Sequence, residues 1–275
     1  MGARGIVAVA CGAGGLAACT LFTDLSGFGG APLDVLPEAG EPIVDAAEDA
    51  APLPIDDAST TDGGCPDGAL CESFDDDLFA SRWDSVMRVG GTANLDGLEF
   101  LSPPRSLRAM TVAGDNPRPK TGYLERRLDP VPSAVRCAFS LRVNVAPSET
   151  AFGWIDIFQL VGTSAGVSRF EQKLAMRRLE TGVRIDVTPD DGGACLCPAD
   201  GVEIARSFPV GEWTRVVFAT DFASVEVRYG DELVLASPFK GSAPTTLQLA
   251  LGLKDYSSVG GGDVSYDDLV CTFTY

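Results

Sequence analysis

The chain has 275 residues and a formal net charge of −18, with 21 Lys or Arg, 39 Asp or Glu and no His. Nucleic-acid binding needs a basic surface stripe, so this balance argues against a nucleic-acid partner. The absence of His excludes a Ser-His-Asp triad and a His-bound zinc-water mechanism. The charge is unevenly spread: residues 19–81 hold 15 acidic residues and no basic one, whereas residues 82–275 hold 24 acidic and 20 basic residues.

Residues 1–18 are predicted to be a bacterial lipoprotein signal peptide. One positive charge, Arg4, precedes a short apolar run and the small residues before Cys19, which is the pattern of such a signal. The run is too short to span a membrane. We therefore expect cleavage before Cys19, acylation of its thiol and attachment to a membrane through the lipid. Because Thr20 follows instead of Asp, the expected location is the outer membrane of a Gram-negative bacterium. A plain secretory signal with a chance Cys is the alternative.

Residues 19–64 are predicted to be a disordered acidic tether. Asp, Glu, Ala, Pro and Gly dominate this segment, and aromatic residues are few. Such a segment buries too little apolar surface to offset the entropy that ordering would cost. Charge repulsion and Pro keep it extended, so we expect it to hold the rest of the chain away from the lipid anchor.

Residues 65–275 are predicted to form one all-β domain. Apolar and polar residues alternate in short runs bounded by Gly, Pro and Asp, and no amphipathic helix of useful length is present. The expected strands include 135–145, 183–187, 213–220, 224–229, 232–235, 246–253 and 263–275. Many short strands at this spacing predict a two-sheet antiparallel sandwich or a barrel.

Six cysteines remain after the signal peptide and the lipidated residue, and an even number in an exported chain predicts disulfides. Cys65 and Cys71 enclose a turn-forming PDGAL segment, so we expect them to pair. Cys137 and Cys271 lie in two strand-like runs and are the second predicted pair. Two interpretations remain open for Cys195 and Cys197: a bridge across one residue, or a thiolate zinc site.

Three stretches resemble the concanavalin A-like superfamily. WTRVVFATDFASVEVRYGDELVLASPF and LALGLKDYSSVGGGDVSYDDLVCTF resemble a hairpin and the final strands of laminin-G-like domains, and CESFDDDLFASRWDS resembles the opening strand of lectin-like domains. The resemblance covers roughly residues 70–275. It implies a jelly-roll fold, which hosts lectins, glycosidases, lyases and adhesion modules, and it therefore leaves function open.

The segment GWIDIFQL, residues 153–160, resembles the strand that carries the catalytic Glu pair in jelly-roll endoglucanases. Retaining chemistry needs two carboxylates a few ångströms apart. Here Asp156 is present but both Glu positions hold other residues, so the resemblance does not carry hydrolase activity over. If Ile155 and Ile157 face the core, then Trp154, Asp156 and Phe158 share the opposite face.

These three residues are predicted to line a ligand-binding groove with neighbouring strands. Aromatic faces stack on sugar rings and charged groups bind hydroxyls. The further candidates are Lys173, Arg177, Arg184 and Asp186. The competing interpretation is a solvated sheet face with cross-strand ion pairs.

The acidic residues Asp263, Asp267 and Asp268 are candidate Ca²⁺ ligands, since this ion prefers six or more oxygens. The favoured alternative places them in a turn and at a bulge, and no other cofactor is expected. The sequence as a whole predicts a surface lipoprotein whose β-sandwich binds a glycan or cell-surface polymer without catalysis. The alternatives are a divergent polysaccharide hydrolase or lyase, and a purely structural or adhesion module.

Overall fold

The computed structural model describes residues 64–114, 119–147, 155–165, 167–179, 182–190, 202–238, 243–256 and 261–275. Within these ranges, the backbone alone is described for residues 167–169, 179, 182–190 and 203. The predicted signal peptide, most of the tether, Cys19, Trp154, Cys195 and Cys197 lie outside the described part of the chain. Among the residues described, no helix is long and apolar enough to cross a membrane.

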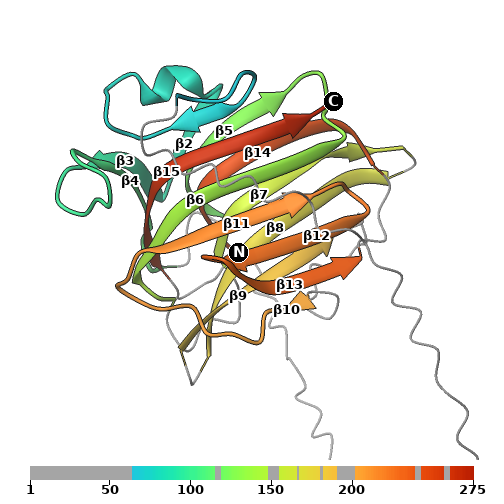
Figure 1. The fold of residues 1–275 in the computed structure, drawn as a ribbon. Helices are drawn as coiled ribbons and strands as arrows, with labels where there is room; N and C mark the ends of the chain where they lie inside the picture. Colours follow the sequence, from blue (N-terminus) through green and yellow to red (C-terminus); the bar gives the residue numbers. More distant parts are fainter. Residues whose placement is uncertain are drawn as a thin grey trace, which may run out of the picture. The chain divides into compact units, whose positions relative to one another are not determined.

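The described strands form two antiparallel sheets that lie as two layers, and the fold is the all-β jelly-roll sandwich that the sequence predicts (Figure 1). The first sheet has eight strands in the order β13 (Glu232–Pro238), β12 (Ser224–Tyr229), β11 (Thr214–Thr220), β6 (Ala134–Val145), β15 (Gly262–Thr274), β4 (Ser106–Thr111) and β3 (Gly91–Asp96), with β1 (Leu70–Glu72) also paired to β15. The second sheet has seven strands in the order β10 (Val202–Glu203), β9 (Gly182–Asp190), β8 (Val167–Leu179), β7 (Ile155–Ser164), β14 (Pro244–Asp255), β5 (Lys120–Leu128) and β2 (Ser85–Val89). The one helical element among the described residues is a 3₁₀ turn, η1 (Phe79–Arg82).

Aromatic side chains from both sheets meet in the core. Phe158 on β7 stacks on Phe139 of β6 with ring centroids 5.6 Å apart, and it contacts Phe218 of β11 at 5.1 Å. The hydroxyl of Tyr266 donates a hydrogen bond to the carbonyl oxygen of Ile157 at 2.7 Å. Because each buried apolar side chain contributes about 1.5–3 kcal/mol, these contacts fix how the two sheets face one another.

The position of Phe158 corrects the predicted groove. The sequence argument placed Phe158 on the same face as Asp156, because residues two apart on a regular strand share a face. Strand β7 contains a β-bulge, however, since Asp156 pairs with Ala175 while Phe158 pairs with the adjacent Leu174. The extra residue, Ile157, reverses the alternation beyond it. Phe158 is therefore buried in the core, and the next residue along the strand, Gln159, takes the position on the outward face.

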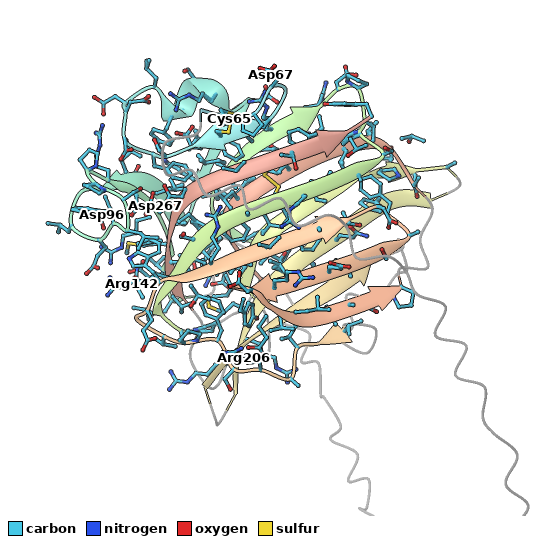
Figure 2. The ribbon with its side chains drawn as sticks, in the orientation of Figure 1. Cys65, Asp67, Asp96, Arg142, Arg206 and Asp267 are labelled. Carbon is cyan, nitrogen blue, oxygen red and sulfur yellow. A yellow bond between two sulfur atoms is a disulfide. The ribbon has the colours of Figure 1, made fainter. Side chains whose placement is uncertain are left out.

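Both predicted disulfides are confirmed. Cys65 and Cys71 are bonded across the loop that precedes β1, and the bond is drawn beside the label of Cys65 (Figure 2). Cys137 and Cys271 are directly opposite one another on β6 and β15 and are also bonded. The second bond joins residues 134 positions apart in the sequence, so it closes a loop that contains most of the domain.

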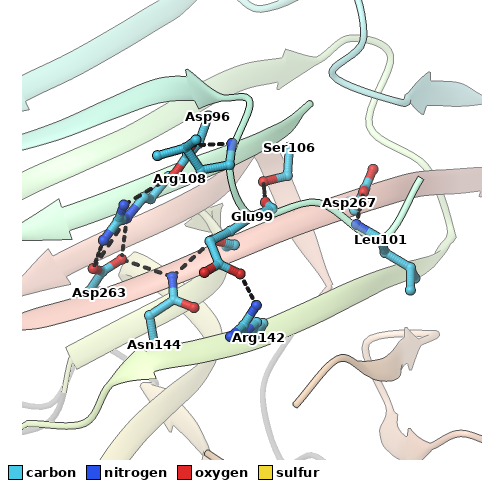
Figure 3. Close-up of polar contacts among 11 residues, drawn as sticks. Asp96, Glu99, Leu101, Ser106, Arg108, Arg142, Asn144, Asp263 and Asp267 are labelled. Atoms are coloured by element: carbon cyan, nitrogen blue, oxygen red, sulfur yellow. Dashed lines mark hydrogen bonds and ion pairs between the residues drawn. The ribbon is translucent and has the colours of Figure 1, made fainter. Parts of the chain in front are cut away.

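Two of the candidate Ca²⁺ ligands on β15, Asp263 and Asp267, have separate sets of partners (Figure 3). The carboxylate of Asp263 accepts hydrogen bonds from the guanidinium of Arg108, through Nε at 3.0 Å and a terminal nitrogen at 2.5 Å. Asp267 instead accepts the backbone N–H groups of Leu101 and Ser102, both at 2.9 Å. These contacts tie the loop between β3 and β4 to the first sheet. Over the described ranges, no three acidic or Cys side chains gather closely enough to hold a metal ion.

Asp267 and Asp268 are consecutive residues of β15, and a regular strand would place them on opposite faces. The hydroxyl of Ser102 lies 3.0 Å from a carboxylate oxygen of Asp267 and 2.9 Å from one of Asp268, so both carboxylates lie on one side. The register of β15 against β6 shifts between Asp267 and Val270, and Asp268 has a positive φ of 49°. This irregularity brings two side chains together that a regular strand would separate.

Candidate active site

The outward face of the seven-stranded sheet carries a cluster of charged and phenolic side chains. On β14, four leucines at alternate positions from Leu247 to Leu253 belong to the core, so Gln248, Ala250, Gly252 and Lys254 point outward. On β8, Phe170, Leu174 and Met176 are core residues, and Glu171, Lys173, Ala175 and Arg177 point outward by the same alternation. The register places Lys254 directly opposite Asp156 of β7.

Lys173 joins two carboxylates in the buried part of this cluster. Its Nζ lies 3.5 Å from Oδ2 of Asp156 and 3.4 Å from Oε2 of Glu171. Lys173 is 4% exposed, and each of the two acids is 1% exposed. Burial raises the pKa of Asp156 to about 6, although the ammonium of Lys173 acts in the opposite direction. Burial also acts to lower the pKa of Lys173, but the charges of Asp156 and Glu171 outweigh it and raise that pKa.

Tyr256 lies between two ammonium groups. Nζ of Lys254 is 5.4 Å from the centroid of the Tyr256 ring, and Nζ of Lys173 is 6.0 Å from it. Both distances are within the range of a cation–π contact. Burial acts to lower the pKa of Lys254, but a hydrogen bond with Tyr256 and the charges of nearby groups outweigh it, so the pKa of Lys254 is raised. Both Lys254 and Tyr256 are partly exposed, so a ligand on this face can reach them.

Tyr123 extends the cluster onto β5. It lies opposite Gly252 of β14. Because Gly252 has no side chain, it does not cover the ring of Tyr123. Burial, followed by the charge of Glu125, raises the pKa of Tyr123, while the ammonium of Lys254 acts to lower it. The cluster therefore contains two phenols, two ammonium groups and a buried pair of carboxylates. These groups come from β5, the end of β14, β7 and β8, which are neighbours in the sheet.

These groups differ in what they can do chemically. The carboxylate oxygens of Asp156 are both buried, and the ammonium of Lys173 lies between Asp156 and Glu171. A pair of carboxylates for glycoside hydrolysis needs contact with the sugar from both sides of the scissile bond, and this pair does not reach the surface. Tyr256 and Lys254 do reach it. A phenol can transfer a proton, and an ammonium can stabilise an anionic ligand or a developing negative charge.

The structure brings some of the predicted ligand-binding residues together and separates others. Asp156 and Lys173 form an ion pair, and Arg177 lies on the same face as Lys173, four residues further along β8. Phe158 is in the core. Trp154 and the side chains of Arg184 and Asp186 lie outside the described residues, although the backbone of β9 pairs Asp186 with Ala175.

Sequence reasoning missed Lys254, Tyr256 and Tyr123. One signal was available: the chain has only four Lys among its 21 basic residues, and Lys254 and Tyr256 are two residues apart at the end of an alternating strand. The pairing that brings them to Asp156 and Lys173 is not visible in the sequence, because β14 lies between β5 and β7, which are distant from it along the chain.

Two solved structures share this fold. The endo-β-1,4-glucuronan lyase of the fungus Trichoderma reesei has 13% sequence identity and a TM-score of 0.53, covering 70% of this chain and 91% of that one. A cellulose-induced protein, Cip1, has 15% identity and a TM-score of 0.53, covering 74% of this chain and 96% of that one. Identities this low show a shared fold and nothing more. No protein-family model matches the chain, and no curated protein matches its sequence.

The comparison contradicts the main functional prediction from the sequence. That prediction was binding of a glycan without catalysis, and it rested on the absence of the Glu pair of jelly-roll endoglucanases. The glucuronan lyase with the same fold favours the alternative, a divergent polysaccharide lyase. The missing Glu pair bears on hydrolysis alone. A lyase that uses Tyr, Arg or Lys stayed open at the level of the sequence, but no residue pattern marked one.

Proposed function

We propose that the described domain is a polysaccharide lyase that cleaves a uronate-containing polymer by β-elimination. The observation that carries the proposal is Tyr256, which lies between the ammonium groups of Lys254 and Lys173 on the outward face of the sheet. Elimination from a uronate needs positive charge beside the sugar carboxylate and a group that transfers a proton. The fold shared with a glucuronan lyase supports the same class of reaction.

The roles follow from exposure and charge. Lys254 is partly exposed and binds the uronate carboxylate, which makes the hydrogen on the neighbouring carbon, C5, more acidic. Tyr256 exchanges protons with the substrate, because it is the phenol that Lys254 holds by a hydrogen bond. Lys173 is buried beside Asp156 and Glu171, which offset its charge, so Lys254 supplies the positive charge that faces the substrate. Asp156 and Glu171 keep Lys173 charged and in place.

The proposed reaction balances without water. The deprotonated oxygen of Tyr256 accepts the proton from C5, the electrons of the C5–H bond form a C4=C5 double bond, and the C4–O glycosidic bond breaks. Tyr256 then gives this proton to the leaving oxygen, which becomes the hydroxyl of the new chain end. One product therefore carries an unsaturated uronate, whereas hydrolysis would leave both products saturated.

The product identifies the reaction. The purified protein is incubated with glucuronan, alginate and a neutral β-glucan, and the ultraviolet absorbance of the unsaturated uronate is followed together with the release of reducing ends. We expect both signals from a uronate polymer and neither from the neutral one. Reducing ends without the absorbance would show hydrolysis, and silence on every uronate polymer would refute the proposal.

A matched pair of substitutions tests the assignment of Tyr256. Tyr256→Phe removes one hydroxyl, and we expect kcat to fall by at least about a hundredfold, as is typical when a general acid or base is lost. Tyr275→Phe removes the same atom from an exposed tyrosine at the chain end, and its activity should equal that of the wild type. Equal activity of both variants would remove Tyr256 from the reaction and leave the class of reaction to the product assay.

A further inference from the structure

A pocket opens on the same outward face beside the candidate active site. It has a volume of about 470 Å³ and is lined by Asp84, Ser85, Glu125, Arg127, Asp129 and Gln248. A second pocket of about 450 Å³ shares Arg127, Asp129 and Gln248 with it and continues to three threonines, Thr163, Thr245 and Thr246. The two pockets together form one polar depression across β5, β14 and the end of β7.

The register of the strands makes this depression continuous with the cluster around Tyr256. On β5, Glu125 is the next outward residue after Tyr123, so the two lie about 7 Å apart. On β14, Gln248 lies opposite Arg127 and Ala250 lies opposite Glu125. Ala250 and Gly252 are the outward residues between Gln248 and Lys254, so no long side chain of β14 stands between the pocket and Lys254.

The two ends of this path differ in charge. At one end Lys254 is the partly exposed charge, and Asp156 and Glu171 offset the charge of the buried Lys173. The first pocket carries three acidic side chains, from Asp84, Glu125 and Asp129, and a single basic one, Arg127. The formal charge of the pocket is therefore negative. A uronate unit bound there would place its own carboxylate among like charges.

The remaining groups of the depression suit an uncharged sugar. Ser85, Gln248 and the three threonines offer hydroxyl and amide groups, which bind sugar hydroxyls as both donors and acceptors. Several of the groups have fixed positions. Ser85 donates a hydrogen bond to Glu125 at 3.0 Å, and the backbone N–H of Arg127 donates one to Asp84 at 2.6 Å. The carboxylates are therefore held at the pocket wall rather than free to turn away from a ligand.

We infer that the substrate is a copolymer in which an uncharged sugar, bound in the pocket of Asp84 and Glu125, accompanies the uronate that is cleaved at Tyr256. The inference rests on the proposed lyase function and deepens it by naming the substrate class. It differs from what the shared fold alone suggests, because in a glucuronan every unit carries a carboxylate.

Two polymers with the same uronate test the inference. Hyaluronan alternates glucuronate with an uncharged N-acetylated hexosamine, whereas glucuronan contains glucuronate alone. The full protein is assayed on both by the absorbance of the unsaturated product. We expect kcat/KM to be roughly tenfold higher on hyaluronan than on glucuronan. A ratio of this size corresponds to the repulsion of a carboxylate by two like charges near water.

The two polymers also differ in their glycosidic linkages. A variant with two fewer charges in the pocket shows whether charge or linkage causes the difference in kcat/KM. The double variant Asp84→Asn, Glu125→Gln keeps the shape of both side chains and their ability to accept the hydrogen bonds from Ser85 and Arg127. We expect its kcat/KM on glucuronan to rise by roughly tenfold over the wild type, so that the preference for hyaluronan over glucuronan is lost. The control variant, Asp231→Asn, Glu212→Gln, removes two exposed charges from loops of the other sheet and should leave both values unchanged.

Each result decides between the proposals. Equal kcat/KM on both polymers by the wild type, with no gain on glucuronan in the double variant, would overturn the inference and leave the lyase function standing. A gain of the same size in the control variant would also overturn it, because net charge and not the pocket would then be responsible. Failure to cleave any uronate polymer would overturn the lyase function and this inference with it.

Discussion

The substitution Asp156→Asn tests whether the carboxylate beneath the active site is desolvated. Burial raises the pKa of Asp156 from an ordinary 3.8 to about 6 in the folded protein. A raised pKa means that folding favours the protonated form, so this stabilisation is complete below about pH 3.8 and is lost as the pH rises through about 6. At 1.36 kcal/mol per pKa unit, the change amounts to about 3 kcal/mol between pH 4 and pH 7.

The assay is equilibrium unfolding in urea at several pH values for the wild type and the variant. Asn cannot ionise, so the variant should gain about 3 kcal/mol relative to the wild type between pH 4 and pH 7. Asp221→Asn is the control with the opposite sign. Partial burial acts to raise the pKa of Asp221, but hydrogen bonds from Ser224 and Ala223 outweigh it and lower that pKa. Its variant should therefore lose stability relative to the wild type as the pH rises. A difference between Asp156→Asn and the wild type that stays constant with pH would refute the desolvation of Asp156.

Three further predictions concern other parts of the chain. Replacing both Cys137 and Cys271 by Ala should lower the free energy of unfolding by about 4 kcal/mol, because the bond closes a loop of 134 residues; an unchanged urea midpoint would contradict this. Gly252 has a φ of +131°, and a Cβ there would overlap the carbonyl oxygen of Gly122, so Gly252→Ala should cost at least about 2 kcal/mol in the same assay. We also propose that Cys19 carries the lipid, so Cys19→Ser should remove the acyl mass and release the protein from membranes, and a variant that stays membrane-bound would exclude this anchor.

The fold was predictable because its signals are local. In the predicted strands 135–145 and 246–253, the alternate residues from Val135 to Val143 and from Leu247 to Leu253 lie in the core. The Cys137–Cys271 pair was predictable because both residues lie on inward faces of long strands, and inward residues of paired strands are within bonding distance.

The site was less predictable because it depends on irregularities and on distant pairings. One bulge residue, Ile157, reverses the face of Phe158, and no residue type in GWIDIFQL marks the bulge. Lys254 meets Asp156 only because β14 inserts between β5 and β7. A lyase that uses Tyr, Arg or Lys was considered from the sequence, but Tyr256 is not marked there because its approach to Lys173 depends on the packing of distant strands.

The position of the last strand has a consequence for how the chain folds. β15 is the last of the described strands in sequence order, yet it lies between β6 and β4 inside the eight-stranded sheet. The other strands of this sheet are therefore synthesised before the sheet can close. Until then β4 and β6 expose unpaired edges, and their pairing with β15 spans more than a hundred residues. Long-range pairing of this kind slows folding and leaves a nascent chain open to aggregation and to chaperones. The central strand of the sheet is thus the last one to become available.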